Sequence, residues 1–240
     1  MTRILVTGAT GFVGSHILAA FREAPVTVIA ACRDPAKLPG WFEGEVRVGD
    51  MRDSAYVDAL PQEADIVCHA AAWSSLYGNS RAEEEKYLKP TLRLLDAVSR
   101  SNVSRFLFPS THGAGRRSGG RDGRAPGHAP GYWPHLGVVV AIEESMRRQA
   151  TETLAMVNLR LGLFVGENYS LGLLPILTPR LKTRLVPWID GGRVPMPLVA
   201  GEDIGQAFRL AALHPDMNGY EAFNILGPAV PTMRDVLTYL

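Results

Sequence analysis

The chain has 240 residues, of which 46% are hydrophobic and 20% charged, and its formal net charge is +1. This length can bury a full core in one large domain, and the near-neutral charge gives no reason to expect a nucleic acid or a membrane surface as a partner. The two cysteines, Cys32 and Cys68, form neither a disulfide framework nor a metal-binding pattern, so we expect no metal site and a cytoplasmic protein.

The first predicted elements are a strand over Ile4–Thr7 and a helix over 12–23, joined by the turn Gly8-Ala9-Thr10-Gly11-Phe12-Val13-Gly14. A glycine-rich turn between a strand and a helix gathers backbone N–H groups at the positive helix end, where a pyrophosphate binds. An ordinary tight turn is the alternative, and the position in the first strand–helix unit disfavours it. We therefore assign pyrophosphate binding to Gly8, Thr10, Gly11, Phe12 and Val13.

Strands and helices continue to alternate along the chain. Apolar runs predict strands over Val26–Cys32, Val46–Val48, Ile66–His69, Arg105–Pro109 and Met156–Leu161, with helical patterns near 54–60, 82–100 and 136–150. Continuous apolar strands are typical of a parallel sheet that is covered on both faces. The sequence therefore predicts an α/β fold with a Rossmann-type doubly wound parallel sheet.

Two segments interrupt this alternation. Residues 113–131 are rich in glycine and arginine and predict a long loop, whose arginines either meet an anionic substrate or, the favoured alternative, are solvated. After residue 165 the sequence becomes proline-rich, so we expect a nucleotide-binding domain over 1–165 and a small substrate-side lobe over 166–240, interleaved with the last sheet elements. A helix start at Thr232 without a stop signal makes that lobe look truncated.

Side chains at the strand ends predict which nicotinamide cofactor binds. Arg33 follows the second strand and can pair with a 2′-phosphate, which favours NADP, whereas Asp34 next to it would favour NAD. A surface arginine without a ligand is the alternative to this role. Asp50 can accept from the adenine amino group while Met51 covers the ring. His69, Ala70 and Ala71 end the fourth strand, where small residues let the cofactor approach the backbone.

These motifs, with Asp203-Ile204 further on, occur in the order typical of one family. The chain resembles the extended short-chain dehydrogenase/reductases, which are the NAD(P)-dependent epimerase/dehydratase-like proteins. The resemblance covers essentially the whole chain and implies an NADP-dependent oxidoreductase or epimerase-like enzyme. Its substrate would be a small carbonyl or hydroxyl compound or a sugar nucleotide. The sequence leaves a homodimer open.

The resemblance fails at the catalytic residues. The family uses a Ser or Thr after the fifth strand and a Tyr-x-x-x-Lys pair on the next helix. Thr111 fits the hydroxyl position, with Ser110 as the alternative if the register differs by one residue. Matching Glu143 to a glutamate common in the family places His135 where the tyrosine belongs and Val139 where the lysine belongs.

An imidazole can replace the missing pair chemically. The reference pKa of tyrosine is about 10, so a tyrosine needs a neighbouring cation to lower its pKa for acid–base work at neutral pH. The reference pKa of histidine is already about 6.5. Thr111 and His135 are therefore the candidate catalytic residues, and His112 is a second candidate imidazole. The alternative is that His135 only caps its helix and that the chain is a non-catalytic NADP(H)-binding sensor or scaffold. The acidic run 83–85 needs no function beyond favouring a helix start, and Pro90 should kink or restart that helix.

Overall fold

The computed structural model describes residues 1–73, 79–114, 134–166, 173–183, 185–186 and 188–240. Its main feature is a sheet of seven parallel strands in the order β3-β2-β1-β4-β5-β6-β9. The strands are β1 (Arg3–Thr7), β2 (Thr27–Cys32), β3 (Glu45–Val48), β4 (Ile66–His69), β5 (Arg105–Thr111), β6 (Ala155–Leu161) and β9 (Tyr220–Ile225). The strand order reverses between β1 and β4, so the predicted doubly wound sheet is confirmed.

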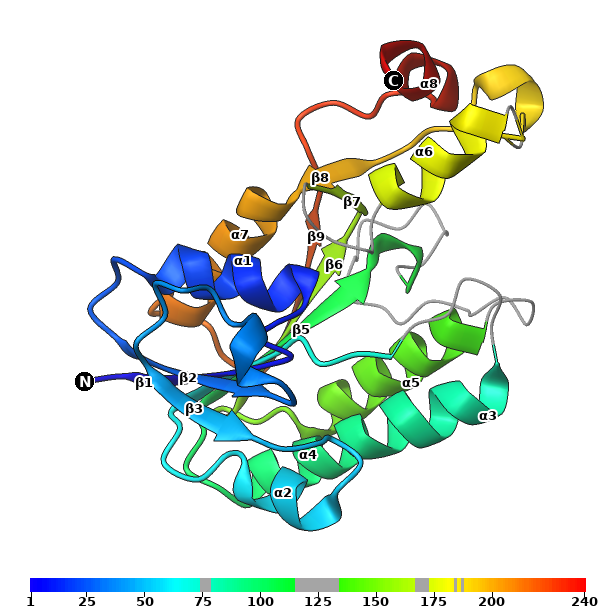
Figure 1. Cartoon of the computed structure of the whole chain (residues 1–240). Coiled ribbons are helices and arrows are strands. Elements are labelled where there is room, and N and C mark those ends of the chain that lie inside the picture. The colour runs from blue at the N-terminus through cyan, green and yellow to red at the C-terminus, as the bar shows by residue number, and fades with distance from the viewer. Residues whose placement is uncertain (74–78, 115–133, 167–172, 184, 187) are drawn as a thin grey trace.

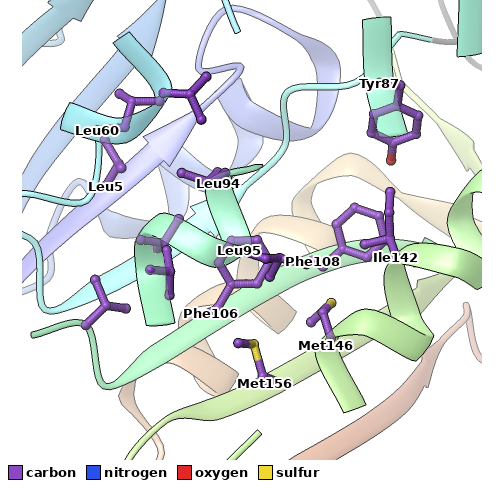
Figure 2. Close-up of a cluster of buried hydrophobic side chains, with 14 of the residues drawn as sticks. Leu5, Leu60, Tyr87, Leu94, Leu95, Phe106, Phe108, Ile142, Met146 and Met156 are labelled. Carbon is purple, nitrogen blue, oxygen red and sulfur yellow. The ribbon is translucent and has the colours of Figure 1, made fainter. Parts of the chain in front are cut away.

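Helices cover both faces of this sheet (Figure 1). On one face α1 (Phe12–Phe21) packs beside α7 (Gly201–Leu213), and on the other lie α2 (Ser54–Ala59), α4 (Lys89–Ser99) and α5 (Pro134–Gln149). Figure 2 shows the core under the second layer, where Leu94, Leu95, Ile142 and Met146 meet Phe106 of β5. The sheet is therefore buried on both sides, as its apolar strands require.

The helix that leads into α4 runs without a break from α3 (Ser80–Glu83) through a π-turn at Glu84–Leu88. The prediction that Pro90 kinks or restarts this helix is confirmed in its second form, because α4 begins at Lys89 with Pro90 in its first turn, while the backbone stays helical across the junction. Proline lacks an N–H and cannot complete the α-helical hydrogen-bond pattern. The π-turn ends where Lys89 N–H donates to the Glu84 carbonyl, immediately before the proline, and so accommodates it.

The part of the chain after β6 contains more regular structure than its composition predicts. A two-stranded sheet joins β7 (Leu163–Val165) to β8 (Leu198–Ala200), and α6 (Leu173–Thr183) packs with α8 (Met233–Tyr239) around a small apolar cluster. The capping box at Thr232 is present as predicted. The chain also returns to the main sheet through α7 and β9. The division into a domain over 1–165 and a lobe over 166–240 stays a prediction.

Candidate functional site

The glycine-rich turn is closed by contacts that exclude side chains. Gly8 has φ +63° and its carbonyl accepts from Gly11 N–H at 2.9 Å. A Cβ on Gly14 would lie 2.1 Å from that same carbonyl oxygen, and a Cβ on Gly8 would lie 2.6 Å from the nitrogen of Ala71. Both distances are far below van der Waals contact, so this turn requires glycine at both positions.

The turn leads directly into α1. Gly11 occupies the N-cap position and provides no side-chain hydrogen bond to the first turn. Because Gly11 has no side chain, the positive end of the helix lies directly behind the glycine-rich turn. A pyrophosphate is the anion that this arrangement suits.

A cleft of about 930 Å³ opens beside this turn at the carboxyl ends of β1, β2, β3 and β4. Its size and its position at the point of strand reversal suit an extended ligand such as a dinucleotide. The predicted cofactor residues that line it are Gly8, Thr10, Gly11, Arg33, Asp50, Met51, His69, Ala70 and Ala71. Phe12 and Val13 do not line it. Phe12 turns its ring away to stack on Phe164 at 4.8 Å, so these two residues would contribute backbone N–H groups only.

The end of the cleft beyond β2 is positively charged. Arg33 and Lys37 line it together with Arg52, which the sequence did not single out. Asp34 does not line the cleft, because its carboxylate accepts from Ala36 N–H at 3.2 Å and lies 3.4 Å from the Lys37 ammonium. Asp34, the acid that would favour NAD, is thus bound to its neighbours in the chain. The Arg33 side chain is exposed at the cleft.

Asp50 is held by a guanidinium rather than left open. Arg52 donates from Nε at 3.0 Å and from its terminal nitrogen at 2.6 Å to the two carboxylate oxygens. These bonds hold the pKa of Asp50 at about 2, so its carboxylate is ionised and fixed in orientation. Next to it, the Tyr56 ring fills the space that a side chain on Gly49 would need.

His69 lies below the cleft and links three elements. Its Nδ1 is 2.7 Å from Thr7 Oγ1 and its Nε2 is 3.0 Å from Thr91 Oγ1. Burial lowers the pKa of His69 to about 3, so the ring is neutral, and one N–H and one lone pair satisfy both contacts. Thr7 Oγ1 also accepts from Ala71 N–H at 3.2 Å. The histidine therefore holds the floor of the cleft in place.

The two hydroxyls at the end of β5 have different surroundings. Ser110 is buried and donates to the Glu143 carboxylate, which also receives two hydrogen bonds from the buried Arg160 at 3.1 and 2.6 Å. Thr111 is half-buried, and its Oγ1 accepts from Gly113 N–H at 3.3 Å. Of the two candidates, only Thr111 keeps a hydroxyl outside the buried charge network.

His135, on the first turn of α5, lies against two residues of the neighbouring helix. Its Nδ1 is 3.1 Å from Oε2 of Glu83, and its ring stacks on Tyr87 with centroids 5.5 Å apart. Tyr87 lines the cleft, and Figure 2 shows it at one margin of the buried cluster. Glu83 lies in the first turn of α3, as expected of a residue that favours a helix start, and its side chain is 0% exposed.

Other sequence candidates have different outcomes. His112 Nδ1 donates to the Leu161 carbonyl at 3.3 Å, which anchors the short helical turn after β5 to β6. Most of the predicted loop over 113–131, including its four arginines, lies outside the described residues. Within the described ranges, no helix has the length and apolarity to cross a membrane, and no cluster of His, Cys, Asp and Glu suits a metal ion.

Comparison with known proteins gives one family match. The model of the NAD-dependent epimerase/dehydratase family matches residues 4–225. A Mycobacterium tuberculosis 3 beta-hydroxysteroid dehydrogenase/Delta 5-->4-isomerase is 31% identical over 117 residues, which are 46% of this chain and 32% of that protein. A Streptomyces antibioticus dTDP-glucose 4,6-dehydratase is 35% identical over 124 residues, 45% of this chain and 37% of that protein. The matched segments thus span about a third of the length of these relatives.

Solved structures share the fold over nearly the whole chain. The UDP-glucose 4-epimerase of Thermus thermophilus, in complex with NAD, has a TM-score of 0.79 and 24% identity over 99% of this chain and 81% of its own. The DesIV double mutant, a Streptomyces venezuelae dTDP-glucose 4,6-dehydratase with NAD bound, has a TM-score of 0.81 and 23% identity over 99% of this chain and 80% of its own. At these identities the similarity concerns the fold.

Proposed function

Because the chain belongs to the NAD-dependent epimerase/dehydratase family, we propose that it is an enzyme that uses NADP, bound in the cleft at the carboxyl ends of β1–β4, to oxidise or reduce a carbon bearing oxygen. One observation carries this proposal. The glycine turn, the N-terminal end of α1 and a rim of basic side chains converge on one cleft at the strand reversal. The first two suit the pyrophosphate of a dinucleotide, and the basic rim suits its 2′-phosphate.

The choice of NADP over NAD rests on the charges beyond β2. Arg33 is exposed at the cleft and makes no hydrogen bond or ion pair with the described residues, whereas Asp34 is engaged by a backbone N–H and Lys37. A guanidinium pairs well with a phosphate, and a carboxylate repels it. Lys37 and Arg52 line the same rim, each paired with an acid, Asp34 and Asp50 respectively. The structural relatives named above bind NAD, so this preference would distinguish the chain from them.

Thr111 and His135 are the residues that we assign to the chemistry. When bound, the nicotinamide supplies or accepts the hydride. Thr111 Oγ1 donates a hydrogen bond to the substrate oxygen, and His135 Nε2 gives a proton to that oxygen in reduction or takes one in oxidation. The two come from neighbouring elements, because a Cβ on Gly113, two residues after Thr111, would lie 3.8 Å from a methyl of Leu136, the residue after His135. Histidine is the side chain whose ordinary pKa suits proton transfer without a neighbouring lysine.

The substrate is proposed at the level of class. Relatives named for their substrates act on a hydroxysteroid or on dTDP-glucose, and both substrates carry a secondary hydroxyl that can become a ketone. We propose a small molecule with such a hydroxyl or carbonyl, with sugar nucleotides tested first. Positive charge on this chain at Lys86, which lines the cleft near Trp73, suits an anionic group on that substrate.

Cofactor binding tests the first half of the proposal. In fluorescence titrations NADPH is expected to bind more tightly than NADH. Arg33→Ala should weaken NADPH binding by about ten- to a hundred-fold, the equivalent of about 1.5–3 kcal/mol for a charge-assisted bond, and leave NADH unchanged. Arg81→Ala is the matched control, because Arg81 is exposed and paired with Glu85 away from the cleft. Equal affinity of the parent protein for both cofactors would refute the preference.

Turnover tests the second half. With NADPH or NADP and a panel of ketones, alcohols and sugar nucleotides, His135→Asn is expected to lower kcat by roughly 10²–10⁴-fold, the usual contribution of one acid–base group. Asparagine keeps an N–H donor near the position of Nδ1 for Glu83, so the fold is preserved while the titrating group is lost. Full activity of this variant would remove His135 from the mechanism. A parent that binds NADPH and turns over nothing on the panel would instead favour a sensor.

A further inference from the structure

Glu83 differs from its acidic neighbours on the same helix. Glu84 and Glu85 are exposed and pair with Lys89 and Arg81 at 3.1 and 2.9 Å. Glu83 is fully buried, its Oε2 lies 3.1 Å from His135 Nδ1, and its Oε1 has no hydrogen-bond partner among the described residues. A buried carboxylate is costly unless it is paired. The described structure gives this one a single ionisable donor, the imidazole of His135.

This contact determines the hydrogen on the ring of His135. An ionised carboxylate only accepts hydrogen bonds, so Nδ1 must carry the hydrogen that it donates to Glu83. In the neutral ring Nε2 is then the basic nitrogen, and in the charged ring the positive charge lies beside the carboxylate. Pairing of this kind between a carboxylate and the far nitrogen of an imidazole fixes tautomer and orientation and stabilises the imidazolium.

The plane of the ring is fixed by a second residue of the same helix. Tyr87, four residues after Glu83, stacks on His135 with an angle of 14° between the rings. Burial raises the pKa of Tyr87, and the Glu83 charge raises it further, so the phenol is neutral near pH 7. Glu83 and Tyr87 are the titratable groups that contact His135 within the described ranges. Tyr87 lines the cleft and His135 does not, so the stack joins the imidazole to a residue of the cleft wall.

We propose that Glu83 is a positioning residue for His135, holding Nδ1–H so that Nε2 exchanges the proton with the substrate oxygen. The inference rests on the proposed function and adds a residue to it. In reduction, the imidazolium gives the Nε2 proton to the substrate oxygen and becomes the neutral ring, still bonded to Glu83. In oxidation, Nε2 takes the proton of the substrate hydroxyl, and Glu83 stabilises the cation that forms. The proton moves between Nε2 and oxygen, and Glu83 keeps its charge throughout.

The test is Glu83→Gln, which keeps the shape and removes the charge. Without cofactor or substrate, the NMR titration midpoint of the His135 ring is expected to move to lower pH, since an opposite charge within hydrogen-bond distance favours the imidazolium. In the active enzyme kcat should fall about 10- to 100-fold, the usual effect of losing an orienting partner, with KM nearly unchanged. The acidic limb of the pH–rate profile for oxidation, and the basic limb for reduction, should move in the same direction as the NMR midpoint.

Glu84→Gln is the matched control and should leave both measurements as in the parent, because that side chain is exposed and paired with Lys89. Glu83→Asp is the second variant. Aspartate keeps the negative charge but is one methylene shorter, so the carboxylate lies further from His135 Nδ1. We therefore expect kcat to fall, with a smaller shift of the His135 midpoint than in Glu83→Gln. An unchanged midpoint and pH profile in an active Glu83→Gln enzyme would overturn this inference alone. A parent without turnover on any substrate would overturn the proposed function, and the catalytic use of Glu83 with it.

Discussion

The pH dependence of stability should report the buried His69. In the folded protein its pKa is about 3 because of burial, whereas an unfolded histidine titrates near 6.5. As the pH falls below 6.5 the unfolded chain binds a proton that the folded chain refuses. The stabilisation is therefore complete above pH 6.5 and is lost as the pH falls towards 3. Between about pH 7.5 and 4.5 this one group should lower the free energy of unfolding by about 3 kcal/mol.

The assay is equilibrium urea unfolding at several pH values in that range. His69→Gln removes the titrating group and leaves an amide between Thr7 and Thr91, so the variant is expected to be less stable near neutral pH but to lose about 3 kcal/mol less on acidification. His214→Gln is the control, since His214 is exposed at the end of α7. Equal acid sensitivity of the parent and His69→Gln would refute the assignment of a neutral, buried His69.

Three further outcomes follow from contacts in the structure. Gly14→Ala should abolish measurable NADPH binding in titrations, because its Cβ would lie 2.1 Å from the Gly8 carbonyl; parental affinity would contradict this. Glu143→Gln should lower the free energy of unfolding by about 3–5 kcal/mol in urea titrations, since it leaves the buried Arg160 without its charge partner, and a loss below about 1 kcal/mol would contradict that estimate. Gly205→Ala should lower the melting temperature, because its Cβ would lie 2.3 Å from the His16 carbonyl. Gly40→Ala is the control and should leave the melting temperature as in the parent, because its Cβ would meet nothing within 4 Å. Equal melting temperatures of the two variants would contradict this packing of Gly205.

The first strands of the fold could be predicted because their apolar sequence pattern matches their buried position in the sheet. The strand Ile4–Thr7 and the predicted strand Ile66–His69 are continuous apolar runs in the middle of the sheet, where both faces are buried. The helix α7 was not predicted, because Gly201 and Gly205 lower helix propensity. Its packing explains both glycines, since side chains at these positions would collide with His16 of α1. That reason is tertiary, so it lies outside the local sequence.

The candidate site divides in the same way. The cofactor side was predicted from residues that directly follow strands, because topology alone brings the ends of parallel strands to one edge. The surroundings of His135 were not predicted, since its contacts with Glu83 and Tyr87 join residues about fifty positions apart on two helices. Glu83 was hidden in an acidic run whose other members are solvated. Only burial distinguishes it, and burial depends on how α5 packs against that helix.

A crystal structure of the protein with bound NADPH tests the central claim most directly. We expect the pyrophosphate at the glycine turn and the first turn of α1, the 2′-phosphate against the Arg33 guanidinium, and the nicotinamide at the end of the cleft nearest Tyr87. Thr111 Oγ1 and His135 Nε2 should then both be able to reach, within about 3 Å, a single oxygen placed against the nicotinamide C4, the distance that proton transfer requires. A nicotinamide ring whose reactive face is turned away from both side chains, or a cofactor bound outside this cleft, would contradict the account.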